Sequence, residues 1–291
     1  MIISLSLYAR LSKLKIMIPV SLTGFAGYFV FKPVFSAGIW LVTAGILLLG
    51  ISASVLNQLQ EIEIDKKMDR TRNRPLASGL VSKRKAYIFS ALSLLAGAAL
   101  ILLGGNTVAF LTGLFTLFWY NVVYTYSKRL TSFAVFPGAL TGALPPMIGW
   151  IAAGGAVFDT KIILIGLLFF IGQMPHFWLI LLKYGREYQE AGLPCLTGIL
   201  TRQQIERLIF VWVALTGIAA ILLYISGIIG NEVVALVILA STLILIWQTS
   251  SLVSSATAKP AVNRYQALLN AYFLLLIFML VSDRIITVYL S

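Results

Sequence analysis

Long apolar segments recur nine times along the chain, separated by short polar connections. Each segment has roughly the ~20 residues that an α-helix needs to cross a bilayer, and the alternation typical of outer-membrane β-strands is absent. The segments fall at residues 14–32, 37–56, 86–104, 107–126, 133–153, 161–182, 205–227, 232–250 and 267–288. The first is full length and has no small-residue cleavage site after it, so we expect a span there and not a signal peptide. The pattern predicts an all-α, polytopic membrane protein with nine transmembrane helices in one domain, residues 1–291.

The composition agrees with this prediction. Of 291 residues, 59% are hydrophobic and 11% are charged, and the mean hydropathy is +0.95. Soluble domains are about 45–50% apolar and about 25% charged. The net charge of +12 would by itself suggest nucleic acid, but so apolar a chain excludes that class of partner. One Cys and one His exclude a disulfide framework, a CxxC redox pair and metal motifs built on His pairs.

The basic residues are distributed unevenly between the two sides of the predicted bundle. Nineteen of the 22 Lys and Arg residues, Lys259 among them, fall in alternate connections, and only Lys32, Lys161 and Arg284 fall in the others. The positive-inside rule then predicts a cytoplasmic N-terminus, an external C-terminus and a place in the cytoplasmic (inner) membrane. The spans hold almost no ionisable residue near their middle, which disfavours ion pumps and proton-coupled carriers.

Most of the few acidic residues gather on the same side, at two places, and the first follows the second span. Asn57, Glu61 and Asp65 recur there at i, i+4 and i+8. In a helix that continues past the membrane they form one stripe with a spacing of about 6 Å. Such oxygen ligands suit Mg²⁺ together with substrate phosphate, and Arg70 and Arg74 can grip phosphate. The alternative is a helix end with i,i+4 ion pairs in a positive-inside loop that has no further function.

The second place follows the sixth span, where Glu187 and Glu190 stand at i,i+3. These carboxylates can face the first stripe and hold a second metal, and two metals across a cavity would stabilise a departing diphosphate. His176 lies two to three turns deeper. A lone His inside a membrane is more often a hydrogen-bonded packing residue than a ligand, so contact with a substrate is the less favoured interpretation.

The fourth and fifth spans add further candidates. Lys128 and Arg129 close the fourth span on the same side and can bind diphosphate, although an ordinary positive-inside loop also explains the pair. Tyr124 lies one turn before them and is a candidate contact for an acceptor. Pro145 and Pro146 predict a break in the fifth span, tolerated only where protein or a cavity satisfies the freed backbone groups.

Four blocks of this sequence resemble the UbiA superfamily of intramembrane prenyltransferases. They lie in the family order, and the first is specific whereas the others are modest. The blocks are Asn57-xxx-Glu61-xxx-Asp65-xx-Met68-x-Arg70-Thr71-xx-Arg74-Pro75-Leu76, Lys128-Arg129-x-Thr131, Gly142-Ala143-x-Pro145-Pro146-xx-Gly149-Trp150 and Gln173-Met-Pro-His176-Phe-Trp. Within the superfamily they look most like the protoheme IX farnesyltransferases, also called heme O synthases.

The resemblance implies a nine-helix bundle around a central cavity, with cytoplasmic cap loops at about 57–85 and 183–204. It implies a Mg²⁺-dependent transferase that takes farnesyl diphosphate, or another polyprenyl diphosphate, and prenylates heme B or another apolar acceptor at the cytoplasmic side of the lipid membrane. By position, it implies catalytic roles for Asn57, Glu61, Asp65 and Glu187, metal binding by Glu61, Asp65, Glu187 and Glu190, diphosphate binding by Arg70, Arg74, Lys128 and Arg129, and acceptor contacts by His176 and Tyr124.

Departures from the family pattern bear mainly on the acceptor. Glu61 and Glu187 stand where relatives usually have Asp, the loop Gly192–Gly198 has a different sequence, and the interval before Lys128 looks one residue shorter. The nearest alternative is a UbiA relative that prenylates an aromatic or quinone-precursor acceptor. A rival of another class is a transporter or lipid-binding protein that uses its basic side for anionic headgroups. Clustered carboxylates disfavour the binding of anionic headgroups, because they would repel such a ligand.

Overall fold

The computed structural model describes residues 2–254 and 262–290, and over these ranges it contains helices and no strand. Lys259 lies outside the described residues. The helices are α1 Ile2–Leu11, α2 Leu14–Phe31, α3 Ala37–Gln60, α4 Ile62–Lys67, α5 Lys83–Gly104, α6 Thr107–Phe118, η1 Trp119–Tyr124, α7 Thr125–Leu130, α8 Val135–Ala152, α9 Thr160–Glu190, η2 Leu196–Gly198, α10 Arg202–Ile225, α11 Glu232–Ser254, α12 Val262–Ile285 and η3 Ile286–Leu290.

The prediction of nine membrane-crossing helices is confirmed within the described part of the chain. Their ends match the predicted segments closely, except that α9 continues past residue 182 to Glu190. At 31 residues α9 is about 46 Å long by the rise of an α-helix, which exceeds the bilayer core. Its last turns therefore carry the second acidic segment, Glu187 and Glu190, beyond the hydrocarbon region. The first acidic segment is the stripe of Asn57, Glu61 and Asp65.

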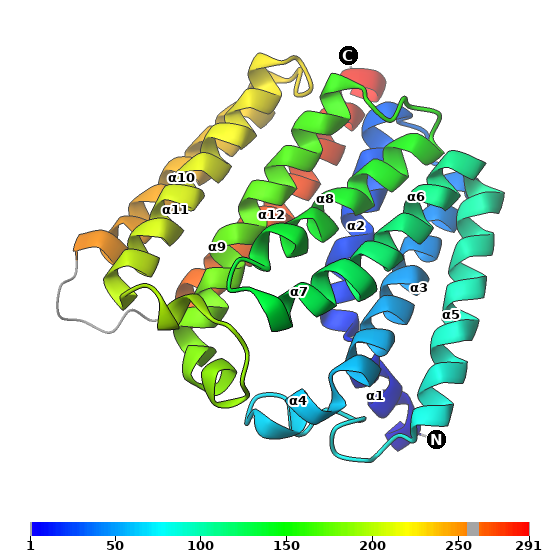
Figure 1. Cartoon of the computed structure of the whole chain (residues 1–291). Helices are drawn as coiled ribbons and strands as arrows, with labels where there is room; N and C mark the ends of the chain where they lie inside the picture. Colours follow the sequence, from blue (N-terminus) through cyan, green and yellow to red (C-terminus); the bar gives the residue numbers. More distant parts are fainter. Residues whose placement is uncertain (1, 255–261, 291) are drawn as a thin grey trace.

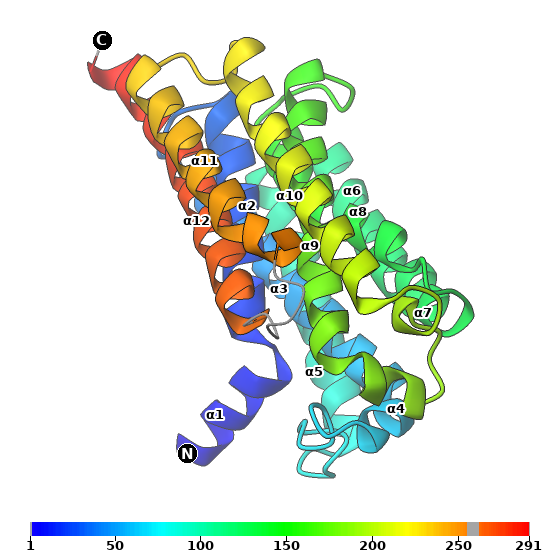
Figure 2. The same ribbon diagram turned by 90° about the vertical axis from the view of Figure 1, so that its left-hand side faces the viewer.

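The spans form a closed ring. Each contacts the next in sequence, and α12 returns to contact α2, while α2 also packs across the ring against α8. Figure 1 shows α1, α4 and the C-terminal turns of α9 at one end of this bundle, with the C-terminus at the opposite end. In Figure 2, α1 projects from the bundle at that same end. The two acidic segments are thus brought to one end of the ring.

The fifth span is one continuous helix, so the predicted break at Pro145 and Pro146 is wrong. The helix lies very close to α2. A Cβ added at Gly149 would lie 1.8 Å from the carbonyl oxygen of Gly24, and one at Gly27 would lie 2.0 Å from that of Pro146. Small residues at such contacts allow membrane helices to approach closely, and neighbouring helices tolerate proline where they support the altered backbone.

The fourth span changes from α-helical to π-helical geometry near its C-terminal end, at the end of the bundle covered by the cap loops. Between α6 and α7 the turn η1 is π-helical, a rare conformation that is frequent at functional sites. Its Asn121 fastens it to α3: Asn121 Nδ2 donates to the Ala53 carbonyl at 3.0 Å, and Gln60 Nε2 donates to the Asn121 carbonyl at 3.1 Å. These bonds fix the two helices together beside the first acidic segment.

An apolar cluster separate from the main core fastens the cap to the bundle. It joins the end of α1 to α3, α4, the loop before α5 and the first turns of α5. Its buried members are Leu11, Ile51, Val55, Ile62, Leu76, Val81 and Ala86. Burial of this set holds the 68–82 loop, and with it Arg70 and Arg74, over the end of α3.

Candidate active site

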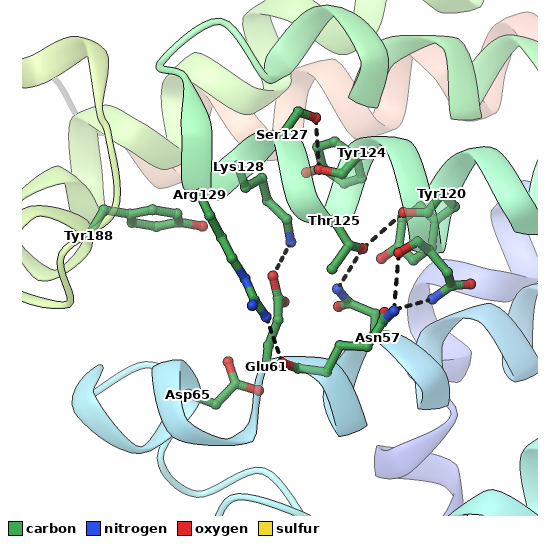
Figure 3. A network of polar contacts seen from close by, with 12 residues as sticks. Asn57, Glu61, Asp65, Tyr120, Tyr124, Thr125, Ser127, Lys128, Arg129 and Tyr188 are labelled. Carbon is green, nitrogen blue, oxygen red and sulfur yellow. Dashed lines mark hydrogen bonds and ion pairs between the residues drawn. The ribbon is translucent and has the colours of Figure 1, made fainter.

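Three parts of the fold converge at the capped end: the junction of α3 and α4, the turn η1 with α7, and the last turns of α9. Figure 3 shows Asn57 and Glu61 on the first of these, facing Thr125 and Lys128 on the second, with Tyr188 of α9 to one side. Asp65 lies beyond Glu61, farther from the bundle. The predicted site residues of the first segment and the basic pair are thus neighbours.

The stripe of Asn57, Glu61 and Asp65 survives a local change in the helix. Glu61 departs from helical geometry, with φ −109° and ψ 12°, and separates α3 from α4. The backbone hydrogen bonds nevertheless continue, because Glu61 N–H donates to the Asn57 carbonyl at 3.0 Å and Asp65 N–H donates to the Glu61 carbonyl at 2.8 Å. The three side chains therefore remain on successive turns, and all three are buried.

Glu61 forms a buried ion pair with the fourth span. Lys128 Nζ lies 2.5 Å from Glu61 Oε1, and the two side chains are 18% and 10% exposed. Burial raises the pKa of the Glu61 carboxyl, but the charge and hydrogen bond of Lys128, aided by Lys13 and Asn57, outweigh it and bring the pKa below its usual value. The pair therefore keeps a carboxylate charged in a place that otherwise disfavours charge.

Asp65 is held by Arg74 from the following loop. Arg74 Nη1 donates to both Asp65 carboxylate oxygens at 2.8 Å, and Asp65 is 5% exposed. The loop is bound to the same residue through its backbone, because Thr71 Oγ1 donates to the Asp65 carbonyl at 3.0 Å. Exposed Glu63 points away from this group and pairs with Lys66 at 2.8 Å.

Lys13 is a member of the cluster that sequence reasoning missed. It is half-buried, adopts the left-handed conformation (φ 49°) just before α2, and lies 3.5 Å through Nζ from Asn57 Oδ1. Burial, together with the positive charges of Arg74 and Lys128, lowers the pKa of its ammonium to about 7. In the sequence, Lys13 stands at the start of the first span, which is an ordinary position for a cytoplasmic lysine and does not indicate a role in the site.

Arg70 joins the two acidic segments. Its backbone N–H donates to Glu187 Oε2 at 3.0 Å and its Nη2 donates to the Tyr188 hydroxyl at 2.9 Å. Its guanidinium also lies over the Tyr184 and Tyr188 rings, at 5.0 and 5.7 Å from their centroids. Tyr184 and Tyr188 were not predicted as site residues. Glu187 was predicted to face the first acidic segment, and in the structure it contacts the cap loop that follows that segment.

Glu190 and Arg129 point to different partners. Glu190 pairs with Arg186 at 2.8 Å on an exposed face of α9. Arg129 reaches down from α7, as Figure 3 shows, and its Nη2 donates to the Gln60 carbonyl at 2.7 Å. Arg129 therefore caps the last turn of α3 next to Glu61, whereas Glu190 lies apart from the buried cluster.

Aromatic side chains continue from the charged cluster into the bundle. Lys128 Nζ lies 4.9 Å from the centroid of the Tyr124 ring. Tyr124 in turn lies 5.9 Å from Phe177, and Phe177 lies 6.4 Å from His176, centroid to centroid. The two predicted acceptor contacts, Tyr124 and His176, are thus linked through Phe177, and the Tyr124 and Phe177 rings both lie between His176 and Lys128.

The predicted metal ligands are engaged with other protein groups in this structure. Glu61, Asp65 and Glu190 each pair with a cation, and Glu187 accepts a backbone N–H. Over the described residues, no three His, Cys, Asp or Glu side chains stand close enough to hold a metal ion together. The donor chemistry still suits Mg²⁺, because Asn57, Glu61 and Asp65 offer hard oxygens on successive turns.

Comparisons with known proteins agree with this geometry. The UbiA prenyltransferase family matches residues 19–282 of this chain. A protoheme IX farnesyltransferase of Oleidesulfovibrio alaskensis is 34% identical over 84% of this chain and 84% of that protein. One of Geobacter sulfurreducens is 42% identical, over 59% of this chain and 63% of that protein, which is less than two thirds of its length.

Solved structures share the fold. A structure concerned with digeranylgeranylglyceryl phosphate synthase aligns with a TM-score of 0.76 at 19% identity, covering 97% of this chain and 98% of that one. A UbiA homologue from Archaeoglobus fulgidus bound to GPP and Mg²⁺ aligns with a TM-score of 0.69 at 17% identity, covering 95% and 99%. Together with the family match, these findings establish that the chain belongs to the UbiA prenyltransferase family.

Proposed function

We propose that this protein transfers the farnesyl group of farnesyl diphosphate to protoheme (heme B), and so makes heme O. The observation that carries the proposal is the pair of buried carboxylate–cation contacts, Glu61 with Lys128 and Asp65 with Arg74, at one end of a membrane bundle. Buried ion pairs contribute little to stability for their cost, so their presence favours a functional role. The naming of the two relatives described above supports the choice of substrates.

The oxygen donors of the site are suited to Mg²⁺, with Asn57, Glu61 and Asp65 as a first set and Glu187 as part of a second. When bound, Mg²⁺ would supply Lewis-acid stabilisation of the leaving diphosphate. The relative from Archaeoglobus fulgidus was solved with GPP and Mg²⁺, which supports the same assignment here.

The cations of the cluster are suited to the diphosphate. Lys128 and Arg74 now neutralise Glu61 and Asp65, and Lys13 lies within electrostatic reach of all four. A diphosphate with its metal would replace these contacts one for one, because each lysine or arginine exchanges a carboxylate for a phosphate oxygen. Arg70 and Arg129 border the same space from the cap and from α7.

The reaction breaks the C1–O bond of the donor, the π bond of a vinyl group and one O–H bond of water, and it forms a C–C bond and a C–O bond. The C1–O bond of farnesyl diphosphate cleaves with its electron pair on the leaving diphosphate, and an allylic cation remains. The π electrons of a heme vinyl group form the new C–C bond, and water adds to the other vinyl carbon with loss of one proton, which gives a hydroxyethylfarnesyl chain. Tyr124, next to Lys128, and Phe177, which packs against Tyr124, can stabilise the cation through their ring faces.

We place this chemistry at the cytoplasmic side of the cytoplasmic membrane, in a single domain over residues 1–291 with cap loops at about 57–85 and 183–204. The distribution of basic residues supports this orientation, with a cytoplasmic N-terminus and an external C-terminus. A membrane site also suits both substrates, since farnesyl chains and heme are apolar and partition into lipid.

A second acceptor class has a specific observation in its favour. The loop after α9 departs from the heme O synthase pattern, and its Cys195 and Thr197 contact each other at 3.1 Å, with Thr197 also accepting from Gln189 at 3.2 Å. Since this loop adjoins the end that carries Glu187, an aromatic or quinone-precursor acceptor is the alternative to heme.

The experiment is incubation of the purified protein in detergent with farnesyl diphosphate, Mg²⁺ and either heme B or an aromatic acceptor such as a hydroxybenzoate. Products are identified by mass spectrometry. The proposal expects heme B to gain the mass of farnesol, the sum of farnesyl and hydroxyl additions. Prenylation of the aromatic acceptor with heme untouched would move the assignment to the alternative class.

A further inference from the structure

Thr125 stands where the π-helical turn of the fourth span meets α3. It is completely buried, and its Oγ1 has two neighbours: the Tyr120 carbonyl oxygen at 2.8 Å and Asn57 Nδ2 at 3.1 Å. Figure 3 shows the hydroxyl between these two groups. Thr125 was part of no predicted site, so its contact with Asn57, 68 residues away, calls for a physical account.

The single proton of the Thr125 hydroxyl decides how the Asn57 amide is oriented. A carbonyl oxygen can only accept, so the contact with Tyr120 uses that proton. The hydroxyl can then only accept from Asn57, which requires the NH₂ group of the amide, and not its oxygen, to face Thr125. A flipped amide would place two acceptor oxygens against each other in a buried place.

The other end of the amide is thereby turned to the charged cluster. With Nδ2 held by Thr125, Asn57 Oδ1 faces Lys13 Nζ at 3.5 Å. Asn57 is 2% exposed, so water cannot stabilise the opposite orientation from outside. Thr125 thus helps to determine that an oxygen, the atom a hard cation prefers, is presented to the charged cluster on the side of Lys13.

The π-helical turn makes this contact possible. In an α-helix the Thr125 N–H would bond to the carbonyl of Asn121, but here it bonds to the Tyr120 carbonyl. The Asn121 carbonyl is released and accepts from Gln60 Nε2 of α3 at 3.1 Å. The extra residue in the turn therefore turns both the Thr125 side chain and a backbone carbonyl towards α3.

We propose that Thr125 is a positioning residue that locks the Asn57 amide with its oxygen towards the diphosphate and metal end of the site. This inference rests on the proposed function and deepens it, because it assigns the orientation of a ligand and not a new ligand. Thr125 itself touches neither substrate nor metal in this account. It acts through Asn57, as residues behind a ligand commonly do.

The test compares Thr125→Val, which keeps the shape but loses the hydroxyl, with Thr125→Ser, which keeps the hydroxyl. Thr216→Val is the matched control, since Thr216 is also completely buried and its hydroxyl donates only within its own helix, to the Trp212 carbonyl at 2.7 Å. The probe is Mn²⁺ with inorganic diphosphate, whose binding to purified protein is followed by electron paramagnetic resonance.

Thr125→Val is expected to weaken Mn²⁺ binding roughly tenfold or more, the usual effect of removing a group that orients a ligand. Thr125→Ser and Thr216→Val should bind like the wild type. Wild-type affinity in Thr125→Val, or an equal loss in Thr216→Val, would overturn the positioning role. Absence of diphosphate release by a wild-type protein that binds Mn²⁺ would instead count against the proposed function.

A second measurement is independent of activity. The fall in the thermal unfolding midpoint caused by Thr125→Val is compared in the wild type and in Asn57→Ala. If Thr125 acts through Asn57, the fall is smaller in the Asn57→Ala background, since the contact is already lost there. An equal fall in both backgrounds would overturn the inference.

Discussion

The two acidic segments of this protein sit at the same end of the bundle but are built differently. Glu61 and Asp65 are buried, and each pairs with a cation from another part of the chain. Glu190 pairs with Arg186 of its own helix on an exposed surface, and Glu187 accepts a backbone N–H of the cap loop. The first segment is thus fixed by tertiary structure, whereas the second is joined to the site through Arg70.

This difference indicates which of the carboxylates take part in the proposed reaction. An exposed i,i+4 pair contributes about 0–1 kcal/mol and needs no function to explain it. The two charges of a buried pair lose their hydration, and their mutual attraction offsets only part of that free-energy cost. We therefore expect a membrane protein to keep such a pair where its function requires the charges. The second segment is joined to the cap loop through the contacts of Arg70 with Glu187 and Tyr188. We therefore expect the first segment to dominate activity and the second to tune it.

The largest expected effects are those of substitutions in the first segment, and Glu61→Gln is one of them. It removes a buried charge that is proposed to bind the Mg²⁺ of the diphosphate, so turnover of farnesyl diphosphate should fall by roughly 10²–10³-fold, the range seen when one stabilising group is removed from a reaction centre. Glu63→Gln is the matched control, because Glu63 is exposed and pairs only with Lys66. Steady-state kinetics at saturating Mg²⁺ measure both, and equal activities would break the contrast between buried and exposed carboxylates.

Lys128→Met should affect both binding and stability. Removal of one partner leaves Glu61 buried and unpaired, which costs about 3–5 kcal/mol of stability, and it also removes a proposed diphosphate contact. We expect a lower unfolding midpoint in detergent and a raised KM for farnesyl diphosphate.

Combining Lys128→Met with Glu61→Gln separates these two roles. The second substitution removes the stranded charge, so the unfolding midpoint should recover in part while activity stays low. Recovery of activity together with stability would show that the pair is structural only.

The smallest expected effect lies in the second segment. Glu187→Gln keeps an oxygen that can accept the Arg70 N–H but removes its charge, and a hydrogen bond to a charged group contributes about 1.5–3 kcal/mol against about 0.5–1.5 kcal/mol for a neutral one, so activity should fall on the order of tenfold. Glu190→Gln should change activity less than about twofold, because its pair with Arg186 is exposed. If Glu190→Gln proves as damaging as Glu61→Gln, the ranking of the two segments is reversed.

Much of the architecture could be predicted from the chain itself. Apolar runs of bilayer length determine the nine spans, because lipid leaves a helix few alternatives, and the i,i+4 spacing of Asn57, Glu61 and Asp65 survives the break at Glu61. The break predicted in the fifth span is absent, since the consequences of Pro145 and Pro146 depend on how α2 packs against them and not on local preference.

The contacts that were not predicted are those between distant segments. The π-helical turn has no known local sequence signal here, and it places Thr125 against Asn57 across 68 residues. Lys13 joins the cluster only because α2 begins beside the end of α3, and Arg70 reaches Glu187 across 117 residues. Sequence spacing indicates which side chains share a helix face, but not which partner from another helix neutralises them.

The most direct test of the central claim is the Mg²⁺-dependent release of diphosphate from farnesyl diphosphate by the wild type, Asp65→Asn and Asp69→Asn. The two variants make the same chemical change four residues apart, but Asp65 is 5% exposed and held by Arg74, whereas Asp69 is 76% exposed and paired with Arg72. The account predicts that release is lost in Asp65→Asn and unchanged in Asp69→Asn. Undiminished release by Asp65→Asn would contradict it.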